Sequence, residues 1–245
     1  MIALLKIEWI KTWRFWMTFV LSIGMPVFFF LFFSGMELSS NSEEQKVLVT
    51  AYMLTMTAFS MSSFGFFSFP AMLVEDKTSY WLTYIEHSSI PVWQYYLVKV
   101  IRVLFCFLLS IVATFLVGAI FRGVSMPLSR WFGAGALLLV SSFLFLAFGL
   151  LISQIKSQQL MTIVGDISFI GLAIIGGSWM PIENFPDWMQ KISKVTPVYH
   201  VNQLVTQFAQ KGQVNGKSLI IILGYVIMIA ALALMIKNKT EVKCC

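Results

Sequence analysis

Long apolar stretches separated by short polar ones make up most of this chain. Stretches of roughly 20 or more predominantly apolar residues recur at 16–36, 47–73, 97–121, 131–152, 158–180 and 218–236. A helix that crosses the hydrocarbon core of a bilayer needs about 20 such residues. The pattern predicts an all-α membrane protein with six transmembrane helices, built as a single transmembrane domain over residues 1–245.

The N-terminal residues 1–15 show a different periodicity. One helical stripe is apolar, and Lys11 and Arg14 lie on the opposite side; the stripe holds Ile2, Leu5, Trp9, Trp13 and Trp16. This pattern is typical of an interfacial helix on the inner leaflet. The alternative is that these residues are the start of the first span. That span is long enough to cross and no A-x-A-like cleavage site follows it, so we expect it to be retained.

The polar stretch after the second span, residues 75–91, contains a candidate short helix. Thr78 or Ser79 can serve as its N-cap and Pro91 disfavours helix in the residue before it, which leaves room for about two to three turns. Trp81 and Tyr84 then lie on one face. A short helix that presents aromatic and charged side chains at the membrane suits contact with a soluble partner. A solvated loop is the alternative.

Residues in the second and third spans predict a helix bend and a contact with the lipid headgroups. Gly65 and Pro70 lie in the second span, where a proline removes a backbone hydrogen bond and bends the helix. The bend can serve as a hinge or only as a packing device. Lys99 and Arg102 begin the third span, where we expect them to snorkel to the lipid headgroups.

Asp166 is the one clearly intramembrane acid, and it lies in the fifth span near Gly165 and Gly171. An ionisable side chain at this depth costs a few kcal/mol and is expected to face protein or water instead of lipid. Asp166 is therefore a candidate for the transport pathway. The alternative is a protonated or hydrogen-bonded packing residue.

The segment between the last two spans, residues 181–217, mixes apolar anchors with prolines. Its first part alternates apolar side chains that can enter the outer leaflet, namely Met180, Phe185, Trp188, Met189 and Ile192, with polar ones that can stay in water, namely Glu183, Asp187, Lys191 and Lys194. This alternation predicts an outer re-entrant helical hairpin that dips partway into the bilayer, shielded by protein.

Composition and charge agree with a multi-pass protein of the cell membrane. Hydrophobic residues make up 58% of the chain and charged residues 11%, whereas soluble domains contain about 25% charged residues. Cytoplasmic loops retain lysine and arginine. Cytoplasmic termini give the inner side the larger basic set, which is Lys6, Lys11, Arg14, Lys77, Lys99, Arg102, Lys156, Lys237, Lys239 and Lys243. The basic balance therefore reflects orientation and contact with the lipid bilayer, and no nucleic-acid partner is expected.

Several motifs that could carry chemistry fail on spacing or placement. Residues 212–218 resemble a P-loop but have three residues between their glycines where four are needed, so we expect no ATP hydrolysis on this chain. Ser178 leads into a proline-rich loop and is a poor nucleophile candidate beside His200. His87 and His200 fall on opposite sides of the membrane and cannot share a metal, so no metal site is expected.

Cys106 lies in a span, and Cys244 and Cys245 are expected to form an inert tail, with lipidation or metal binding as alternatives.

Two motifs resemble ABC type-2 transporter permeases. Before the last span, the chain matches the signature of that family through Gly177, Pro181, Glu183, Pro186, Trp188 and Pro197. After the second span, the family order of an acidic residue, a basic residue, a proline and a lysine is met by Glu75, Lys77, Pro91 and Lys99. Thr78-Ser79 replaces the Gly-Thr of the family, and Val98 replaces a glycine.

The resemblance implies the permease subunit of an ATP-driven exporter. ATP and magnesium would bind a separate ABC ATP-binding subunit, with no cofactor on this chain, and a second permease, identical or related, would complete the pathway. The family coupling helix would correspond to Glu75, Lys77, Trp81, Leu82, Tyr84 and Pro91. The exported class would be a drug, an antimicrobial peptide or a lipid-like compound, with antibiotic resistance as one output. The alternatives are a secondary transporter and a sensor or immunity protein that does not transport.

Overall fold

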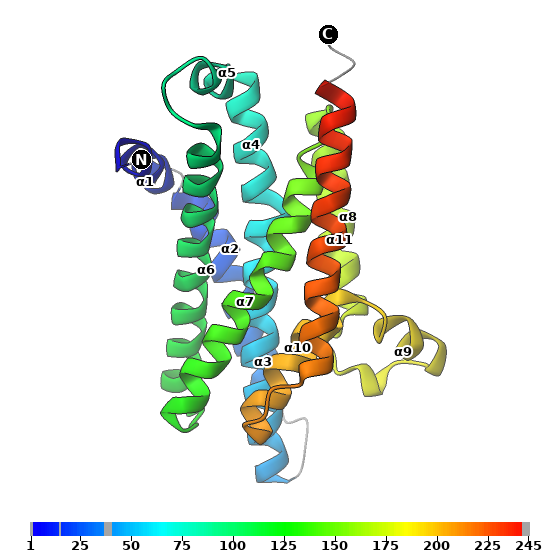
Figure 1. Cartoon of the computed structure of the whole chain (residues 1–245). Coiled ribbons are helices and arrows are strands. Elements are labelled where there is room, and N and C mark those ends of the chain that lie inside the picture. The colour runs from blue at the N-terminus through cyan, green and yellow to red at the C-terminus, as the bar shows by residue number, and fades with distance from the viewer. Residues whose placement is uncertain (1, 15, 37–40, 242–245) are drawn as a thin grey trace.

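A computed structural model of the chain describes residues 2–14, 16–36 and 41–241, and every regular element in these ranges is a helix. In chain order the elements are α1 (Ile2–Arg14), α2 (Trp16–Ser34), α3 (Ser42–Ser63), the π-helical segment η1 (Phe64–Ser68), α4 (Phe69–Thr78), α5 (Trp81–Glu86), α6 (Val92–Arg122), α7 (Leu128–Ile152), α8 (Gln158–Ile175), the 3-10 segment η2 (Ile182–Asn184), α9 (Asp187–Ser193), α10 (Pro197–Lys211) and α11 (Gly216–Glu241). The long helices lie side by side, with α5 at one end of the bundle, the α5 end, and α10 toward the other, the α10 end (Figure 1). Residues 37–40, from the first polar loop, and Cys244 and Cys245 lie outside the described residues.

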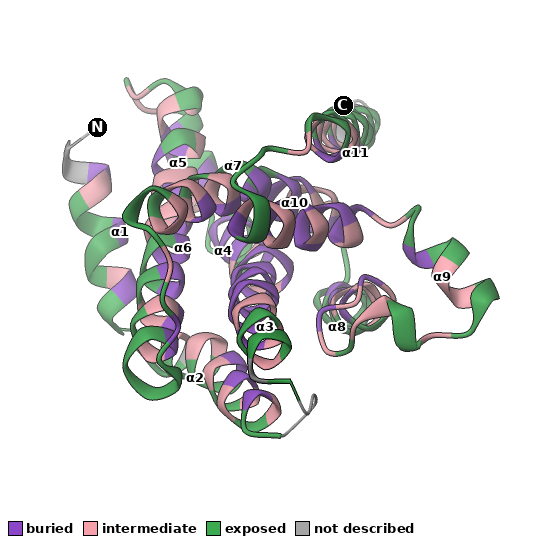
Figure 2. Ribbon diagram, turned by 90° about the horizontal axis from the view of Figure 1, so that it is seen from below, coloured by how far each residue is buried: buried purple, intermediate pink, exposed green. Residues whose placement is uncertain are grey.

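Most of the expected spans are present as continuous helices. Among the described residues, five helices are long and apolar enough to cross a membrane: Glu43–Thr78, Val92–Arg122, Leu128–Ile152, Gln158–Ile175 and Gly216–Lys237. A sixth is reached if the pair formed by α1 and α2, bent by 59°, counts as one span. The expectation of an all-helical, multi-pass membrane protein is confirmed, with five to six candidate spans. Helix α1 runs across the direction of the long helices (Figures 1 and 2).

The fifth predicted span, 158–180, is shorter than expected. Helix α8 ends at Ile175 because Gly176 and Gly177 follow, and Gly177 has φ +72°, a left-handed conformation that glycine adopts without steric cost. The second predicted span, 47–73, is longer, because α3, η1 and α4 continue one into the next from Ser42 to Thr78.

The middle of the second span crosses α7 at very short range. A Cβ atom placed on Gly65 would lie 2.6 Å from Cβ of Phe145, and one placed on Gly149 would lie 2.3 Å from the carbonyl oxygen of Gly65. Only glycine permits this approach. The π-helical turn η1 begins here, and Pro70 follows it as the second residue of α4 within one continuous helix. The proline is thus part of a close packing contact, and its use as a hinge stays a prediction.

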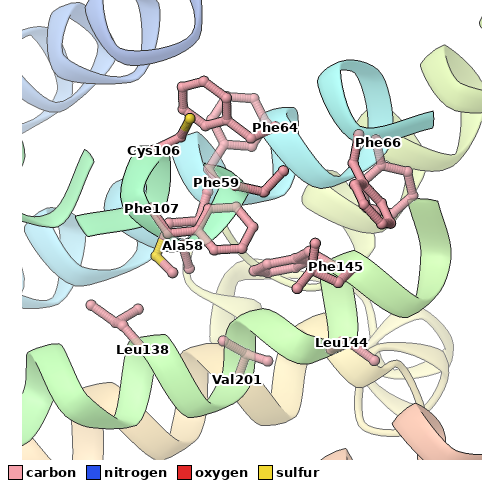
Figure 3. Packing of buried hydrophobic residues seen from close by; sticks show 14 of the residues in the cluster. Ala58, Phe59, Phe64, Phe66, Cys106, Phe107, Leu138, Leu144, Phe145 and Val201 are labelled. Atoms are coloured by element: carbon pink, nitrogen blue, oxygen red, sulfur yellow. The ribbon is translucent and has the colours of Figure 1, made fainter. Parts of the chain in front are cut away.

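The buried core joins α3, η1, α6, α7 and α10 (Figures 2 and 3). Helix α10 was not expected, since residues 181–217 were assigned to a hairpin and loop. Its apolar residues recur at helical spacing and are buried, as at Val201, Leu204 and Val205, and the Thr196 side chain caps its N-terminus by accepting a hydrogen bond from Tyr199. The spacing in the sequence was sufficient to predict this helix.

Candidate functional site

The stretch at the α5 end folds as a short helix between α4 and α6. Helix α5 has six residues, fewer than the two to three turns expected. Leu82 and Ile85 are buried and anchor it to the bundle. The predicted N-caps are wrong: the Thr78 hydroxyl donates to the carbonyl of Glu75 inside α4, and Ser79 is the C-cap of that helix.

Tyr80 makes the turn between α4 and α5. With φ 59° it is the one non-glycine residue with positive φ in the described part of the chain. Left-handed backbone costs a residue with a Cβ atom roughly 1–2 kcal/mol. This left-handed residue turns the chain from α4 into α5, and the Tyr80 ring lies on the surface.

The aromatic residues of α5 lie together, as their spacing predicts. The rings of Trp81 and Tyr84 stack with centroids 5.6 Å apart and planes at 17°. Tyr84 is 65% exposed, whereas Trp81 is partly buried and has the ammonium of Lys11 5.9 Å from its ring centroid. Trp81 and Leu82 therefore hold the segment in place, and the surface is formed by Tyr80 and Tyr84.

The remaining residues of the predicted coupling set also lie at the α5 end. Glu75, Lys77 and Pro91 are exposed, and Pro91 immediately precedes α6 as its N-cap residue. The structure therefore brings the whole predicted set to the α5 end and separates its anchoring members from its surface members.

A buried cluster of charged side chains lies directly beneath α5. The ammonium of Lys99 on α6 lies 2.5 Å from Oδ2 of Asp76 on α4 and 2.7 Å from Oε1 of Glu8 on α1. Arg102 Nη1 donates to Oε2 of Glu8 at 2.6 Å, and Lys11 Nζ lies 3.3 Å from Oδ1 of Asp76. The Tyr95 hydroxyl also donates to Oδ2 of Asp76, at 2.8 Å. We call Glu8, Lys11, Asp76, Lys99 and Arg102 the charge cluster.

The charge cluster connects three helices that are distant in the sequence. Burying a charge is costly unless it is paired and hydrogen-bonded, and here each buried carboxylate has at least two partners. Lys99 thus joins α1, α4 and α6 at one point. The expectation that Lys99 snorkels to the headgroups is wrong, because its side chain is 1% exposed and its charge is neutralised inside the protein.

Neither Glu8 nor Asp76 was among the predicted site residues. Glu8 is a single acid in an apolar N-terminal helix, and this was the available signal for a buried partner. The face of α1 that packs against α6 contains the polar residues Glu8 and Thr12, which are buried. Trp13, from the apolar stripe, is exposed. A pairing between residues 91 positions apart leaves no periodic pattern in the sequence.

Asp166 lies on an exposed face of α8. Its neighbours on that face, Ile163, Ile167 and Ile170, are exposed as well. Within the described residues Asp166 has no hydrogen bond or ion pair, so the structure of one chain offers no partner for a hydrogen-bonded packing role.

The predicted outer hairpin contains η2 and α9 and projects from the side of the bundle (Figure 1). Each proline of the signature stands at the start of a helix: Pro181 precedes η2, Pro186 precedes α9, and Pro197 opens α10. A fixed φ and a missing N–H suit these positions. The polar residues expected in water are exposed, namely Glu183, Asp187, Lys191 and Lys194, and Trp188 is 64% exposed on the chain surface.

Comparisons with known proteins identify the family. The model of the ABC-2 family transporter protein matches residues 35–236. The chain is 28% identical over 220 residues to a Bacillus subtilis (strain 168) protein named "Putative transport permease YvfS", covering 90% of this chain and 89% of that protein. It is 35% identical over 65 residues to "Probable multidrug ABC transporter permease YbhR" of Escherichia coli (strain K12), covering 26% of this chain and 18% of that protein. No solved structure matches it. The chain, a multi-pass helical protein with the signature of transporter permeases before its last span, belongs to the ABC-2 family of transporter proteins.

Proposed function

We propose that this chain is the membrane-spanning permease subunit of an ATP-driven exporter, and that a separate ABC ATP-binding subunit docks on α5. The observation that carries the proposal is the position of α5. This short helix lies at the end of the bundle, presents Tyr80 and Tyr84, and is anchored by Leu82 and Ile85. Exposed aromatics beside the exposed charges of Glu75 and Lys77 are the type of surface that supplies binding energy at protein interfaces.

The charge cluster supports a role for α5 in transmitting motion. Asp76 lies five residues before Trp81, and its carboxylate is bound to Lys99 on α6 and Lys11 on α1. A displacement of α5 by the partner is thereby passed to three helices at once, because paired buried charges resist separation. In this proposal ATP and magnesium bind the partner, and its closure drives the rearrangement of the spans.

The proposed orientation places the α5 end in the cytoplasm. The expected cytoplasmic lysines and arginines, apart from Lys243, which lies outside the described residues, fall on α1, the end of α4, the start of α6, the loop before α8 and the end of α11. These segments lie toward the α5 end (Figure 1). Trp9, Ile10 and Trp13 on α1 are exposed, which suits an interfacial helix in the inner leaflet. The hairpin of η2 and α9 is then external.

A second permease subunit would complete the pathway. Ile163, Ile167 and Ile170 surround Asp166 on the exposed face of α8, whose first turns also expose Gln159 and Thr162, and a carboxylate directed at lipid would be costly. A water-filled pathway or a second copy of this chain or a relative against α8 removes that cost. Asp166 is accordingly the pathway candidate of this proposal. The exported compound is a drug, an antimicrobial peptide or a lipid-like molecule.

Retention of the ATPase tests the docking surface. The tagged chain is co-expressed with an ATP-binding subunit encoded beside it, purified, and assayed for co-purifying ATPase and for ATP-dependent uptake into inverted vesicles. Tyr84→Ala should reduce retention by roughly tenfold or more, the size of a lost interface anchor. Trp188→Ala is the matched control, because Trp188 and Tyr84 are 64% and 65% exposed but lie on different elements. Equal retention by both variants would refute docking on α5.

Cysteine labelling tests the orientation. In a background with Cys244 and Cys245 replaced by serine, a membrane-impermeant maleimide should label Asn184→Cys in intact cells and Thr83→Cys only in inverted vesicles. Both positions are exposed. The reverse pattern would place the α5 end outside.

A further inference from the structure

A cavity of about 380 Å³ lies between α3, the end of α8, η2 and α10. Several of the lining residues carry polar side chains, namely Tyr52, Glu183, Tyr199, Asn202, Gln203 and Gln207. The volume falls at the lower end of the range of small-molecule sites. None of these residues takes part in the charge cluster or the docking surface.

Asn202 supplies an acceptor with no partner in the described part of the chain. Its Nδ2 donates to the carbonyl of Gly176 at 2.9 Å and to Oγ of Ser178 at 3.1 Å. A carbonyl can only accept, so the orientation of the carboxamide is fixed. Oδ1 is left buried without a hydrogen bond on a residue that is 5% exposed. A buried acceptor of this kind costs roughly 1–3 kcal/mol, and because Oδ1 is itself buried it is not a contact atom for a ligand in the cavity.

Glu183 gives the cavity its charge. It is the one charged residue among the described residues that line the wall. Burial raises the pKa of the Tyr199 phenol, and the charge of Glu183 adds to that shift. The wall therefore combines a carboxylate with the rings of Tyr52 and Tyr199.

Two glutamines add polar groups to the cavity wall. Oε1 of Gln203 accepts from the Ser218 hydroxyl at 3.0 Å, and Oε1 of Gln207 accepts from Nδ2 of Asn215 at 2.8 Å. Each oxygen already accepts one hydrogen bond, and the side-chain N–H groups of both residues can donate to a ligand. A ligand here would place its cation at Glu183 and its hydrogen-bond acceptors, if it has any, toward α10.

We propose that this cavity binds the cationic head of an organic ligand, an ammonium or amidinium group whose N–H donors reach the carboxylate of Glu183 beside the rings of Tyr52 and Tyr199. Carboxylates bind such groups by charge-assisted hydrogen bonds, and tyrosine rings attract cations. The inference deepens the proposed function and rests on it: organic cations are then a class of compound that the transporter exports, held near the α10 end before release.

Three probes that share one ring and differ in charge test the inference. Benzamidine, benzamide and benzoate are titrated into the purified full chain in detergent by calorimetry. Benzamidine should bind at millimolar concentration or below, benzamide at least about tenfold more weakly, and benzoate not at all. Glu183→Gln should weaken benzamidine by about tenfold or more. Asp187→Asn should have no effect, because Asp187 is an exposed acid of the same hairpin that does not line the cavity.

The outcomes separate this inference from the proposed function. Failure of benzamidine to bind, equal binding of all three probes, or unchanged binding in Glu183→Gln would overturn the cation site, even if ATP-dependent uptake into inverted vesicles is normal. Calorimetry needs no ATPase, so selective, Glu183-dependent binding would establish the site even if ATP-driven transport were absent. Glu183 is exposed and its amide variant is nearly isosteric, so a folding defect is not expected; thermal unfolding of the variant checks this.

Discussion

The ammonium of Lys99 lies 2.5 Å from Oδ2 of Asp76, and both side chains are 1% exposed. The same ammonium lies 2.7 Å from Glu8. A single buried cation therefore holds one carboxylate from α4 and one from α1, and Lys11 on α1 adds a second contact to Asp76, at 3.3 Å. Loss of Lys99 would remove a partner from both carboxylates at once, and a buried charge with too few partners is costly.

Replacing Lys99 by methionine should destabilise the protein strongly. Asp76 and Glu8 would each lose their shared partner while still buried, at a cost of about 3–5 kcal/mol. Thermal or denaturant unfolding of the detergent-solubilised chain measures the effect. Lys46→Met is the control, since the Lys46–Glu43 pair is 72% and 77% exposed and should contribute under about 1 kcal/mol. Similar losses in both variants would show that the charge cluster has no special role in stability.

Gly65→Ala should be destabilising, the opposite of the usual effect in a helix. Alanine normally gains about 0.5–1 kcal/mol over glycine in a helix interior. At Gly65 the added Cβ would lie 2.6 Å from Cβ of Phe145, so α7 must move, at roughly 1–3 kcal/mol. Gly171→Ala on α8 has nothing within 4 Å of the added atom and should be neutral or stabilising. Unfolding curves that rank the two variants the other way would contradict the crossing geometry.

Tyr80→Asn separates the effect of the left-handed backbone at Tyr80 from the effect of its exposed ring. Asparagine tolerates the left-handed conformation at φ 59° better than tyrosine, so the turn before α5 should gain a few tenths of a kcal/mol to about 1 kcal/mol. The exposed ring is lost at the same time. If that ring contacts the ATPase, retention should fall although the permease is more stable. Retention that is unchanged would restrict docking to Tyr84 and its neighbours.

His200 should make stability depend on pH. Burial is the main cause that lowers its pKa, the charge of Lys217 adds to it, and a hydrogen bond with the backbone of Lys194 opposes it. Because the folded pKa lies below the unfolded value of about 6.5, the unfolded chain binds the proton more readily. The contribution of the neutral ring to the free energy of unfolding is therefore fully present above about pH 6.5. It is lost as the pH falls through the lowered pKa of His200 in the folded protein.

Melting temperatures of the wild type and of His200→Gln, recorded between about pH 5 and pH 8, measure this contribution. The variant should have a smaller decrease on the acid side, because it has no ring to protonate. The same pH dependence in both proteins would show that other groups are responsible.

Asp166→Asn should keep the fold and alter transport if Asp166 faces the pathway. The amide is nearly isosteric and carries no charge, and Asp166 is exposed on α8 without a partner in the described chain. Asp166→Leu should impair transport further. ATP-dependent uptake into inverted vesicles, normalised to the amount of folded protein, measures the effect. Normal uptake by both variants would remove Asp166 from the pathway.

Apolar periodicity in the sequence determined the helical membrane class and the approximate position of each long helix, because a span needs about 20 apolar residues wherever it packs. Local spacing also determined that Trp81 and Tyr84 share a face, and glycine and proline marked where helices end. The apolar spacing of residues 197–211 contained α10 as well, and its prediction required only the 3.6-residue period.

The tertiary structure decided which polar residues are buried and with which partners. Lys99 could equally reach the headgroups or enter the protein, and only the approach of α1 to α6 places Glu8 beside it. The same holds for the cavity, where Glu183 and Asn202 come together because the hairpin folds back onto α10. Hydrophobic burial is set by local composition and repeats along the chain, whereas an ion pair between residues 91 positions apart depends on the packing of whole helices.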